Sequence, residues 1–342
     1  MGITNLDYIE LKKQLEEKGL LGYTLFYYFL NFLMNTMLLA LLLVIVFYLD
    51  NWYATILMAI PIAFIGIQFG YLGHDAGHNA VSKNQFINDF MGQFCHSLVL
   101  GLSFSYWRDD HNKHHANPNH ESIDPNMFDL YSFTEKKARE RSGFGKLVTR
   151  YQSFLLIPAS LMLFFIIRYD SVKYIFKNKK VIFLDLLLII IHVLIFFVSA
   201  YYFIGFIQAI VLYLVVTLLM GVHFGFSFIP NHVGMPVLTG NEKLSFLEKQ
   251  TITSRDIKSG KLLDIIFGGL NYQIEHHLFP NISRKNLRQI KNIVKDFCIK
   301  KVIPYKDETL LLAWKDIFTY LHNIGKSTNV KISILKTLRS MV

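Results

Sequence analysis

The residues of this chain that are best suited to chemistry are histidines, and they gather in three short clusters. The clusters are His74-Asp75-Ala76-Gly77-His78, His111-Asn112-Lys113-His114-His115 and Gln273-Ile274-Glu275-His276-His277. Histidines four residues apart share one face of a helix, with about 5–6 Å between their Cβ atoms, which is close enough to chelate one ion. Two adjacent histidines point about 100° apart and suit two ions or opposite sides of one cluster. The pattern predicts that the three clusters close on one metal centre.

The number of imidazoles indicates more than one metal ion. A tetrahedral zinc site needs only three or four protein ligands. The clusters supply seven histidines: His74, His78, His111, His114, His115, His276 and His277. Two ions fit this number better, but imidazole suits Fe, Zn, Cu and Ni alike, so the ligand type does not name the metal. An eighth candidate ligand is His232, which follows Pro230 and Asn231.

Polar side chains next to these histidines are candidates to accept hydrogen bonds from the free ring N–H groups and so orient the ligands. They are Asp75, Asp109, Asp110, Asn231 and Glu275. Gln273 lies one helical turn before the last two histidines. It is a candidate of either kind, a metal ligand or a supporting residue.

The remaining histidines are expected to have ordinary roles. His192 lies deep within an apolar run, where an ionisable group is a functional candidate by default. Its distance from the clusters favours a neutral, hydrogen-bonded core residue. His223 is expected to pack or to line a channel rather than to bind metal. We interpret His96, His120 and His322 as ordinary residues.

Long apolar runs must position the clusters. Hydrophobic residues make up 52% of the chain and charged residues only 18%, and apolar runs longer than about 18 residues are candidate transmembrane helices. Four such runs form two hairpins, 23–49 with 53–73 and 181–203 with 205–229. The tips of the hairpins carry no Lys or Arg, whereas these residues crowd 108–180 and 243–339, which is the positive-inside pattern of membrane proteins.

A single metal centre requires all three clusters on one side of the membrane. With two hairpins, the first two clusters lie between the hairpins and the third follows the second hairpin, so all three face the cytosol. The apolar run 151–167 would break this arrangement if it crossed the membrane alone. Its basic flanks predict that it lies in the interface instead. The run 94–106 is too short to span and is expected to be re-entrant or interfacial.

The predicted fold is an all-α integral membrane protein, a single domain over 1–342 with interfacial helices and a cytosolic helical cap that carries the histidines. The expected parts are a cytosolic or interfacial helix (1–22, capped at Thr4), a first hairpin (23–73), a cytosolic part with two clusters (74–180), a second hairpin (181–229) and a cytosolic part with the third cluster (230–342). Amphipathic helices are expected at 284–302 and 308–324.

Composition excludes several other classes. The net charge of +10 does not indicate a nucleic-acid-binding protein, because the basic residues follow the membrane pattern. A basic cytosolic face suits anionic lipid head groups or an acidic redox partner. Cys95 and Cys298 lie far apart and imply neither a disulfide nor a metal site. Residues 1–20 are too polar for a cleavable signal peptide.

In this order, the clusters resemble the three histidine boxes of membrane fatty acid desaturases, HxxxH, HxxHH and QxxHH. The run 112–119 continues the second box as it does in that family, and Pro230-Asn231-His232 also fits. The run 268–280 is similar to the third box of the front-end group, in which Gln replaces the first histidine. The resemblance covers about residues 60–300.

The resemblance implies a non-haem di-iron centre that activates O₂ and removes two hydrogens from an acyl chain. The cofactor supplies the oxidation, and the protein holds one methylene pair in a tunnel walled by the transmembrane helices. The front-end group, with Δ5, Δ6 and Δ8 enzymes, inserts the double bond between the carboxyl end and an existing one. The substrate is a long lipid- or CoA-linked acyl chain.

The resemblance also bears on the electron donor. Many front-end members carry a fused cytochrome b5 with a His-Pro-Gly-Gly motif, and that motif does not occur in this sequence. The chain thus resembles the shorter bacterial and cyanobacterial members. A separate ferredoxin or cytochrome b5 is expected to deliver electrons, and a bacterial cell membrane is the expected location.

Two other functions are compatible with parts of the pattern. A lipid or alkane hydroxylase could use the same scaffold, although Gln273 and the surrounding run 271–280 favour a desaturase. A histidine-rich metal transporter, which belongs to a different class, should have ligands at mid-membrane depth along a path. Here the candidate ligands gather at one face, and only His192 lies deep.

Overall fold

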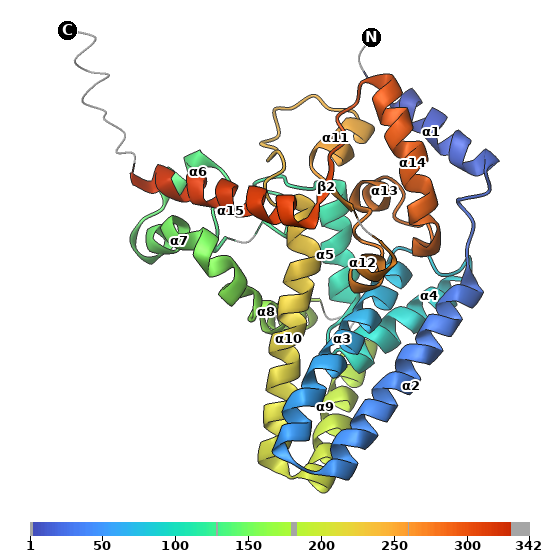
Figure 1. Ribbon diagram of the computed structural model, residues 1–342, viewed down its shortest axis with the longest axis vertical. Helices are drawn as coiled ribbons and strands as arrows, with labels where there is room; N and C mark the ends of the chain where they lie inside the picture. Colours follow the sequence, from blue (N-terminus) through green and yellow to red (C-terminus); the bar gives the residue numbers. More distant parts are fainter. Residues whose placement is uncertain (1–2, 128, 179–182, 259, 330–342) are drawn as a thin grey trace.

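The computed structural model describes residues 3–127, 129–178, 183–258 and 260–329, and nearly all of its regular structure is helical. A long bundle lies at one end and a broader cap at the other (Figure 1). Four helices are long and apolar enough to cross a membrane: α2 (Leu25–Leu49), α3 (Trp52–Gly77), α9 (Phe183–Ile204) and α10 (Phe206–His232). They form two sequential hairpins, which confirms the predicted all-α class with four candidate spans.

Each hairpin closes through a tight turn at the end of the bundle far from the cap (Figure 1). Asp50 follows α2 with a φ of 37°, a left-handed conformation that Asp tolerates. Asn51 then caps α3, because its side chain accepts a hydrogen bond from the backbone N–H of Ala54 at 2.9 Å. Gly205 makes the second turn with a φ of 78°, which favours glycine.

The central helix of the bundle is α3, since 61% of its most apolar stretch is buried, compared with 11% for α2 and for α9. It packs between α2 and α10. Phe69 shares a core cluster with Tyr28 of α2, and Tyr71 shares another with Met220 of α10. Both α3 and α10 continue into the cap, so the first histidine cluster and His232 lie at their last turns.

The second histidine cluster lies on a helix that follows a sharp corner. Helix α4 (Gln85–Gly92) runs into a π-helix, η1 (Gln93–Val99), and the corner at 100–103 leads into α5 (Phe104–Ala116). The run 94–106 thus turns inside the bundle, and η1 packs against α3 and α9. Gly101 has a φ of 62°, and the ring of His192 lies 2.7 Å from where a Cβ would stand, so the corner requires glycine.

The apolar run 151–167 does not form one straight span. It is divided between α7 (Gly143–Ser160) and α8 (Leu163–Lys177), which meet at an angle of 80°. Pro158 lies in the last turn of α7, where it removes a backbone donor and favours the bend. Gly221 of α10 lets the bend approach closely, because a Cβ there would lie 2.5 Å from the carbonyl oxygen of Ser160.

The cap consists of short helices and one small sheet. Its elements are α1 (Asn5–Glu17), α6 (Glu135–Glu140), α11 (Phe246–Ile252), α12 (Lys261–Ile266), α13 (Gln273–Leu278), α14 (Arg284–Lys301), α15 (Leu310–Lys326), a 3₁₀ turn (Ser327–Asn329) and the strands β1 (Asp256–Lys258) and β2 (Asp307–Thr309). The strands pair in parallel, with Asp256 opposite Asp307. Helices α14 and α15 confirm the two predicted amphipathic helices.

Helix α1 begins where the sequence predicts, with Thr4 and Asp7 forming a reciprocal capping box. Its Leu11 and Leu15 are fully buried in a core that includes Ile290 of α14. The apolar side of α1 is therefore used to hold the cap together, in addition to the surface role that its sequence suggests.

Two glycines of α3 let aromatic rings pack against the first histidine cluster. A Cβ on Gly73 would overlap the ring of His96, and a Cβ on Gly77 would overlap the ring of Trp107. Trp107 in turn stacks on His111 of the second cluster, with ring centroids 4.5 Å apart. Gly77 thus sets how closely α5 approaches α3, and Gly73 sets how closely η1 approaches it.

We expect Gly77→Ala to destabilise the protein by about 1–3 kcal/mol, because the added methyl displaces Trp107 in a tightly packed region. Gly70→Ala on the same helix is the matched control, since its Cβ would meet only Leu100 Cδ1 at 3.6 Å, an ordinary contact. Thermal unfolding in detergent measures both. Equal midpoints for the two variants would contradict this account of the packing.

Candidate metal centre

The structure brings seven of the predicted histidines into two groups of potential metal ligands. His74, His78, His111 and His276 form one group, and His114, His232 and His277 form the other. Within each group the ligand atoms all lie within 4.8 Å of one another. Helices α3, α5 and α13 build the first group, and α5, α10 and α13 build the second.

The eighth histidine, His115, lies between the two groups. Its ring centroid is 4.5 Å from that of His78, 4.7 Å from His276 and 4.2 Å from His277. Its Nε2 atom is 3.1 Å from Nε2 of His111. All eight predicted histidines therefore meet in one place, at the junction of the bundle and the cap.

The ring nitrogens fit a metal because several have no other partner. Nε2 of His78, His276 and His277 is buried without a hydrogen bond among the described residues. Burial, reinforced by the neighbouring imidazoles, holds the pKa of His111, His276 and His277 well below the usual value. Neutral imidazoles offer the lone pair that a metal needs. The donor set suits two first-row transition ions such as iron.

Acceptors on the far side of the rings fix which nitrogen faces the centre. Asp75 accepts a hydrogen bond from Nδ1 of His74 at 3.0 Å, which leaves Nε2 of that ring for a metal. The same carboxylate accepts a bond from Tyr28 Oη at 2.8 Å and one from Arg284. Asp75 thus bonds the ring of a candidate ligand, and it also ties α3 to α2 and α14.

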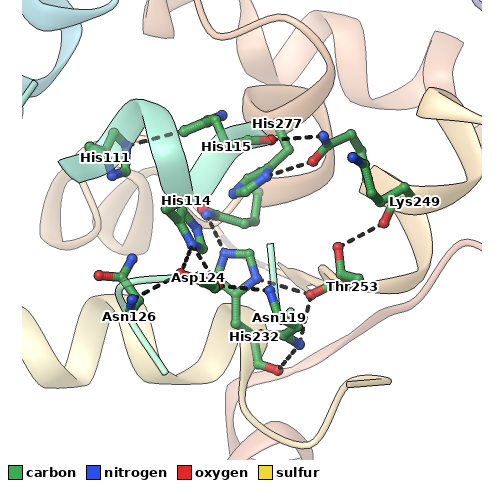
Figure 2. A network of polar contacts seen from close by, with 12 residues as sticks. His111, His114, His115, Asn119, Asp124, Asn126, His232, Lys249, Thr253 and His277 are labelled. Atoms are coloured by element: carbon green, nitrogen blue, oxygen red, sulfur yellow. Dashed lines mark hydrogen bonds and ion pairs between the residues drawn. The ribbon is translucent and has the colours of Figure 1, made fainter. Parts of the chain in front are cut away.

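Three supporting groups were not predicted from the sequence. Figure 2 shows Nδ1 of His114 facing the Asp124 carboxylate, at 3.0 Å from both oxygens. Nδ1 of His277 donates to Gln250 Oε1 at 2.9 Å, and Nδ1 of His232 donates to the carbonyl oxygen of Thr253 at 2.9 Å. These residues are separated in the sequence from the histidines that they bond, or lie in loops, so no spacing rule identifies them.

The other predicted supporting residues have different partners. Glu275 accepts a hydrogen bond from Tyr305 at 2.8 Å, and burial together with Asp256 raises its pKa well above the usual range. Asn231 donates to Gln273 Oε1 at 3.0 Å and to the backbone carbonyl oxygens of Ser227 and Leu270. Asp110 lies in a cavity wall, where burial raises its pKa to about 6. None of these side chains bonds a described histidine ring.

Gln273 points at one histidine of the second group. Its Nε2 lies 2.9 Å from Nε2 of His232, while its Oε1 accepts the bond from Asn231. The Nδ1 of His232 already donates to a carbonyl, so its Nε2 carries the lone pair that the Gln273 amide approaches. The Gln273 amide thus lies beside the second group of candidate ligands.

The histidines expected to be ordinary have protein partners. His192 bonds the carbonyl oxygen of Leu98 at 3.0 Å and Tyr213 Oη at 3.1 Å, as predicted for a hydrogen-bonded core residue. His223 donates to the carbonyl oxygen of Ile266 at 2.8 Å. His96 is buried and bonds the carbonyl oxygen of Gly70 at 3.1 Å.

A cavity of about 950 Å³ adjoins the centre. His111, His114 and His232 form part of its wall. Apolar side chains of α7, α8 and α10 line another part: Leu156, Ala159, Leu163, Ile167, Phe224 and Phe228. The volume lies at the upper end of the roughly 300–1,000 Å³ typical of small-molecule sites. Only α10 among the four candidate spans lines it, and the bent pair α7–α8 supplies the opposite wall.

We expect Asp124→Asn to lower metal affinity by about 10–100-fold, because His114 loses the carboxylate that orients it. Asp110→Asn is the matched control, since Asp110 adjoins His111 in sequence but bonds no described ring. Metal content after dialysis against a graded chelator separates the two variants. Equal metal retention would show that Asp124 does not support the site.

Comparison with known proteins agrees with the histidine pattern. The family described as "Fatty acid desaturase" matches residues 50–309. An acyl-lipid (9-3)-desaturase of Physcomitrium patens is 29% identical over 94% of this chain and 63% of its own length. The Delta(6)-fatty-acid desaturase fat-3 of Caenorhabditis elegans is 27% identical over 86% of this chain and 70% of its own.

A Delta(8)-fatty-acid desaturase of Borago officinalis is 28% identical over 70% of this chain and 57% of its own length. The chain thus spans 63% of the length of the Physcomitrium patens relative and 57% of the length of the Borago officinalis relative. The family match covers most of the chain and includes every candidate ligand. The chain therefore belongs to the fatty acid desaturase family.

Proposed function

We propose that the chain is an O₂-dependent desaturase that introduces a cis double bond into a long acyl chain, with two irons held by the eight histidines. The observation that carries this proposal is the apolar cavity whose wall includes ligands from both groups, His111 from one and His114 and His232 from the other. A methylene pair held there would lie beside both metal positions. Family membership supports the same reaction class.

Iron, when bound, would supply O₂ activation and hydrogen removal. The chain's own residues bind and orient the substrate. Phe224 and Phe228 stack with centroids 4.3 Å apart and offer a smooth apolar wall. Asp75 and Asp124 hold the ring N–H protons of His74 and His114, which keeps those imidazoles in one orientation. The apolar part of the wall, which includes Leu163 and Phe224, would keep water from the reacting carbons.

Two observations favour front-end regiochemistry. Relatives named Δ6 and Δ8 desaturases match across most of the chain. Gln273 occupies the first position of the third cluster and reaches His232. We propose that Gln273 either ligates iron through its oxygen or orients His232, and that the double bond forms between the carboxyl end and an existing one.

The polar part of the cavity wall suits a charged carrier of the acyl chain. Lys136, Lys173 and Lys177 line it and are exposed. They could hold the anionic head of a lipid- or CoA-linked substrate. The cap lies at one end of the bundle (Figure 1), and the ligand groups lie on the helix ends that meet it. We propose that this end faces the cytosol of a bacterial cell, where a ferredoxin or cytochrome b5 delivers electrons.

A hydroxylase on the same scaffold is the first alternative. Expression in a host fed defined fatty acids, followed by gas chromatography–mass spectrometry, distinguishes the two, because a new double bond supports the proposal and a new hydroxyl group overturns it. A metal transporter is the second alternative. Its path would need ligands at mid-membrane depth, whereas His192 bonds only Leu98 and Tyr213 among described residues. About two tightly held irons per purified chain would exclude it.

We expect His78→Ala, His114→Ala and His277→Ala each to reduce desaturation below detection while the protein still inserts into the membrane, because each removes a buried ligand. His322→Ala is the control, since His322 lies exposed on α15. Product analysis in the expressing host measures all four variants. Retained activity in any of the first three would remove that histidine from the ligand set.

Gln273→His should be milder than the loss of a histidine and retain activity within about 10-fold, because imidazole can also ligate a metal or contact His232. Gln273→Leu removes both polar atoms at similar size and is expected to lose more. Initial rates normalised to membrane-inserted protein compare the two. If Gln273→Leu matched the unaltered protein, Gln273 would have no role in the centre.

A further inference from the structure

Three ionisable side chains inside the helical bundle lie outside the metal centre and share one target, the corner between η1 and α5. Asp185 is fully buried in the first turn of α9. His192 lies seven residues on, two turns along the same helix, and Arg168 lies on α8. Charged groups within spanning segments are costly and mark functional candidates. Each of these three bonds residues 97–105.

Each of the first three backbone N–H groups of α5 has a side-chain acceptor. The first three N–H groups of α5 have no partner within the helix. That of Phe104 donates to Ser97 Oγ at 3.2 Å, that of Ser105 to Asp185 Oδ2 at 3.1 Å, and that of Tyr106 to Ser103 Oγ at 3.0 Å. The hydroxyl of Ser103 then donates to the same Asp185 oxygen.

Asp185 is therefore the acceptor on which this set of bonds converges. Its other oxygen lies 3.4 Å from Ser97 Oγ, whose hydroxyl has a closer acceptor in Gln93 Oε1 at 2.8 Å, so the bonds to Ser103 and Ser105 are the ones by which Asp185 holds the corner. A carboxylate at a helix N-terminus also complements the positive end of the helix dipole. It holds α5 from a different helix, α9, which packs against η1.

The carbonyl side of the corner is held from α8 and again from α9, and α10 contacts the Arg168 side chain. Arg168 donates to the carbonyl oxygen of Leu100 at 2.9 and 2.7 Å and to Thr217 Oγ1 at 2.9 Å. His192 donates to the carbonyl oxygen of Leu98. Helices α8 and α9 thus hold both sides of the corner. At the start of α5, Asp185 acts together with Ser97, Ser103 and Ser171 of α8, which accepts the backbone N–H of Ser103 at 2.6 Å.

The position of this start determines where the second histidine cluster lies. Helix α5 contributes His111 to one ligand group and His114 to the other. A slip of one residue at its start would move each ring by about 1.5 Å along the axis and about 100° around it. A metal site tolerates only about 0.2 Å in its ligand distances. Such a slip would therefore disrupt both groups at once.

We propose that Asp185 is a positioning residue that sets the start of α5 and thereby the register of His111 and His114 against the other ligands. The inference about metal binding stands on the ligand groups alone, whereas its consequence for the product rests on the proposed desaturase function. Tyr106 and Trp107 of α5 also line the cavity. A displaced α5 would then alter which carbon pair reaches the centre.

The test compares Asp185→Ala and Asp185→Asn in purified, monodisperse protein. Iron per folded chain is measured after reconstitution with Fe²⁺, and double-bond position is measured in an expressing host. Gln208→Ala is the matched control. Gln208 is a buried polar residue on a spanning helix that bonds Thr55 Oγ1 at 2.6 Å, at the opposite end of the bundle.

We expect Asp185→Ala to lower iron affinity per folded chain by about 10–100-fold and to give a mixture of double-bond positions. Asp185→Asn should recover most of the iron, because it keeps an acceptor oxygen and the same volume. Gln208→Ala should lower only the yield of folded protein. If Asp185→Ala fails to fold, Ser103→Ala removes one of the two bonds that Asp185 makes at the start of α5, together with the cap on Tyr106, and we expect a loss of iron in the same direction.

Wild-type iron and an unchanged product in the folded Asp185 and Ser103 variants would overturn the proposal, because Asp185 would then only stabilise the bundle, as Gln208 does. A wild-type protein that binds iron but forms no double bond would instead overturn the desaturase function, and the iron measurement would still judge Asp185. The two failures are therefore distinguishable.

Discussion

Eight imidazoles face one another where water is largely excluded, and their ring nitrogens cannot all find hydrogen-bond partners within the protein. Nε2 of His111 lies 3.1 Å from Nε2 of both His74 and His115, and a single ring N–H can donate to only one of them. Unsatisfied buried polar groups are costly. Metal ions relieve that cost, and binding free energy then becomes folding free energy. The arrangement of the helices that carry these rings brings the eight imidazoles together.

The ligands come from the ends of four helices, and ion pairs and hydrogen bonds hold those ends at one level. Asp75 joins the end of α3 to Arg284 at the start of α14. Arg255, fully buried, bonds the carbonyl oxygens of Pro230 and Val233 at the end of α10 and pairs with Glu308 of β2. These contacts couple the spanning bundle to the cap, so the centre is as rigid as the junction between them.

The histidines could be predicted from the sequence because their signals are local. Helical spacing places His74 beside His78, and the distribution of charge places all clusters on one side. Most residues that support the rings could not be predicted in this way. Asp75 bonds the ring beside it, whereas Glu275 bonds Tyr305 and Asp110 lines the cavity. Asp124 is brought to His114 only by the tertiary fold. The bend at 160–163 likewise depends on the close approach of α10 as well as on Pro158.

Helix α1 shares its core with α14, so α1 is completed only by a helix far along the sequence. Leu11 and Leu15 remain without their partners until Ile290 and Val294 have been synthesised. Both hairpins can enter the membrane before that point, but the third histidine cluster emerges only after them. Contacts so distant in sequence form slowly. All the candidate ligands are present only after both hairpins and the third cluster have been made, so a metal ion would complete the centre late in the synthesis of this chain.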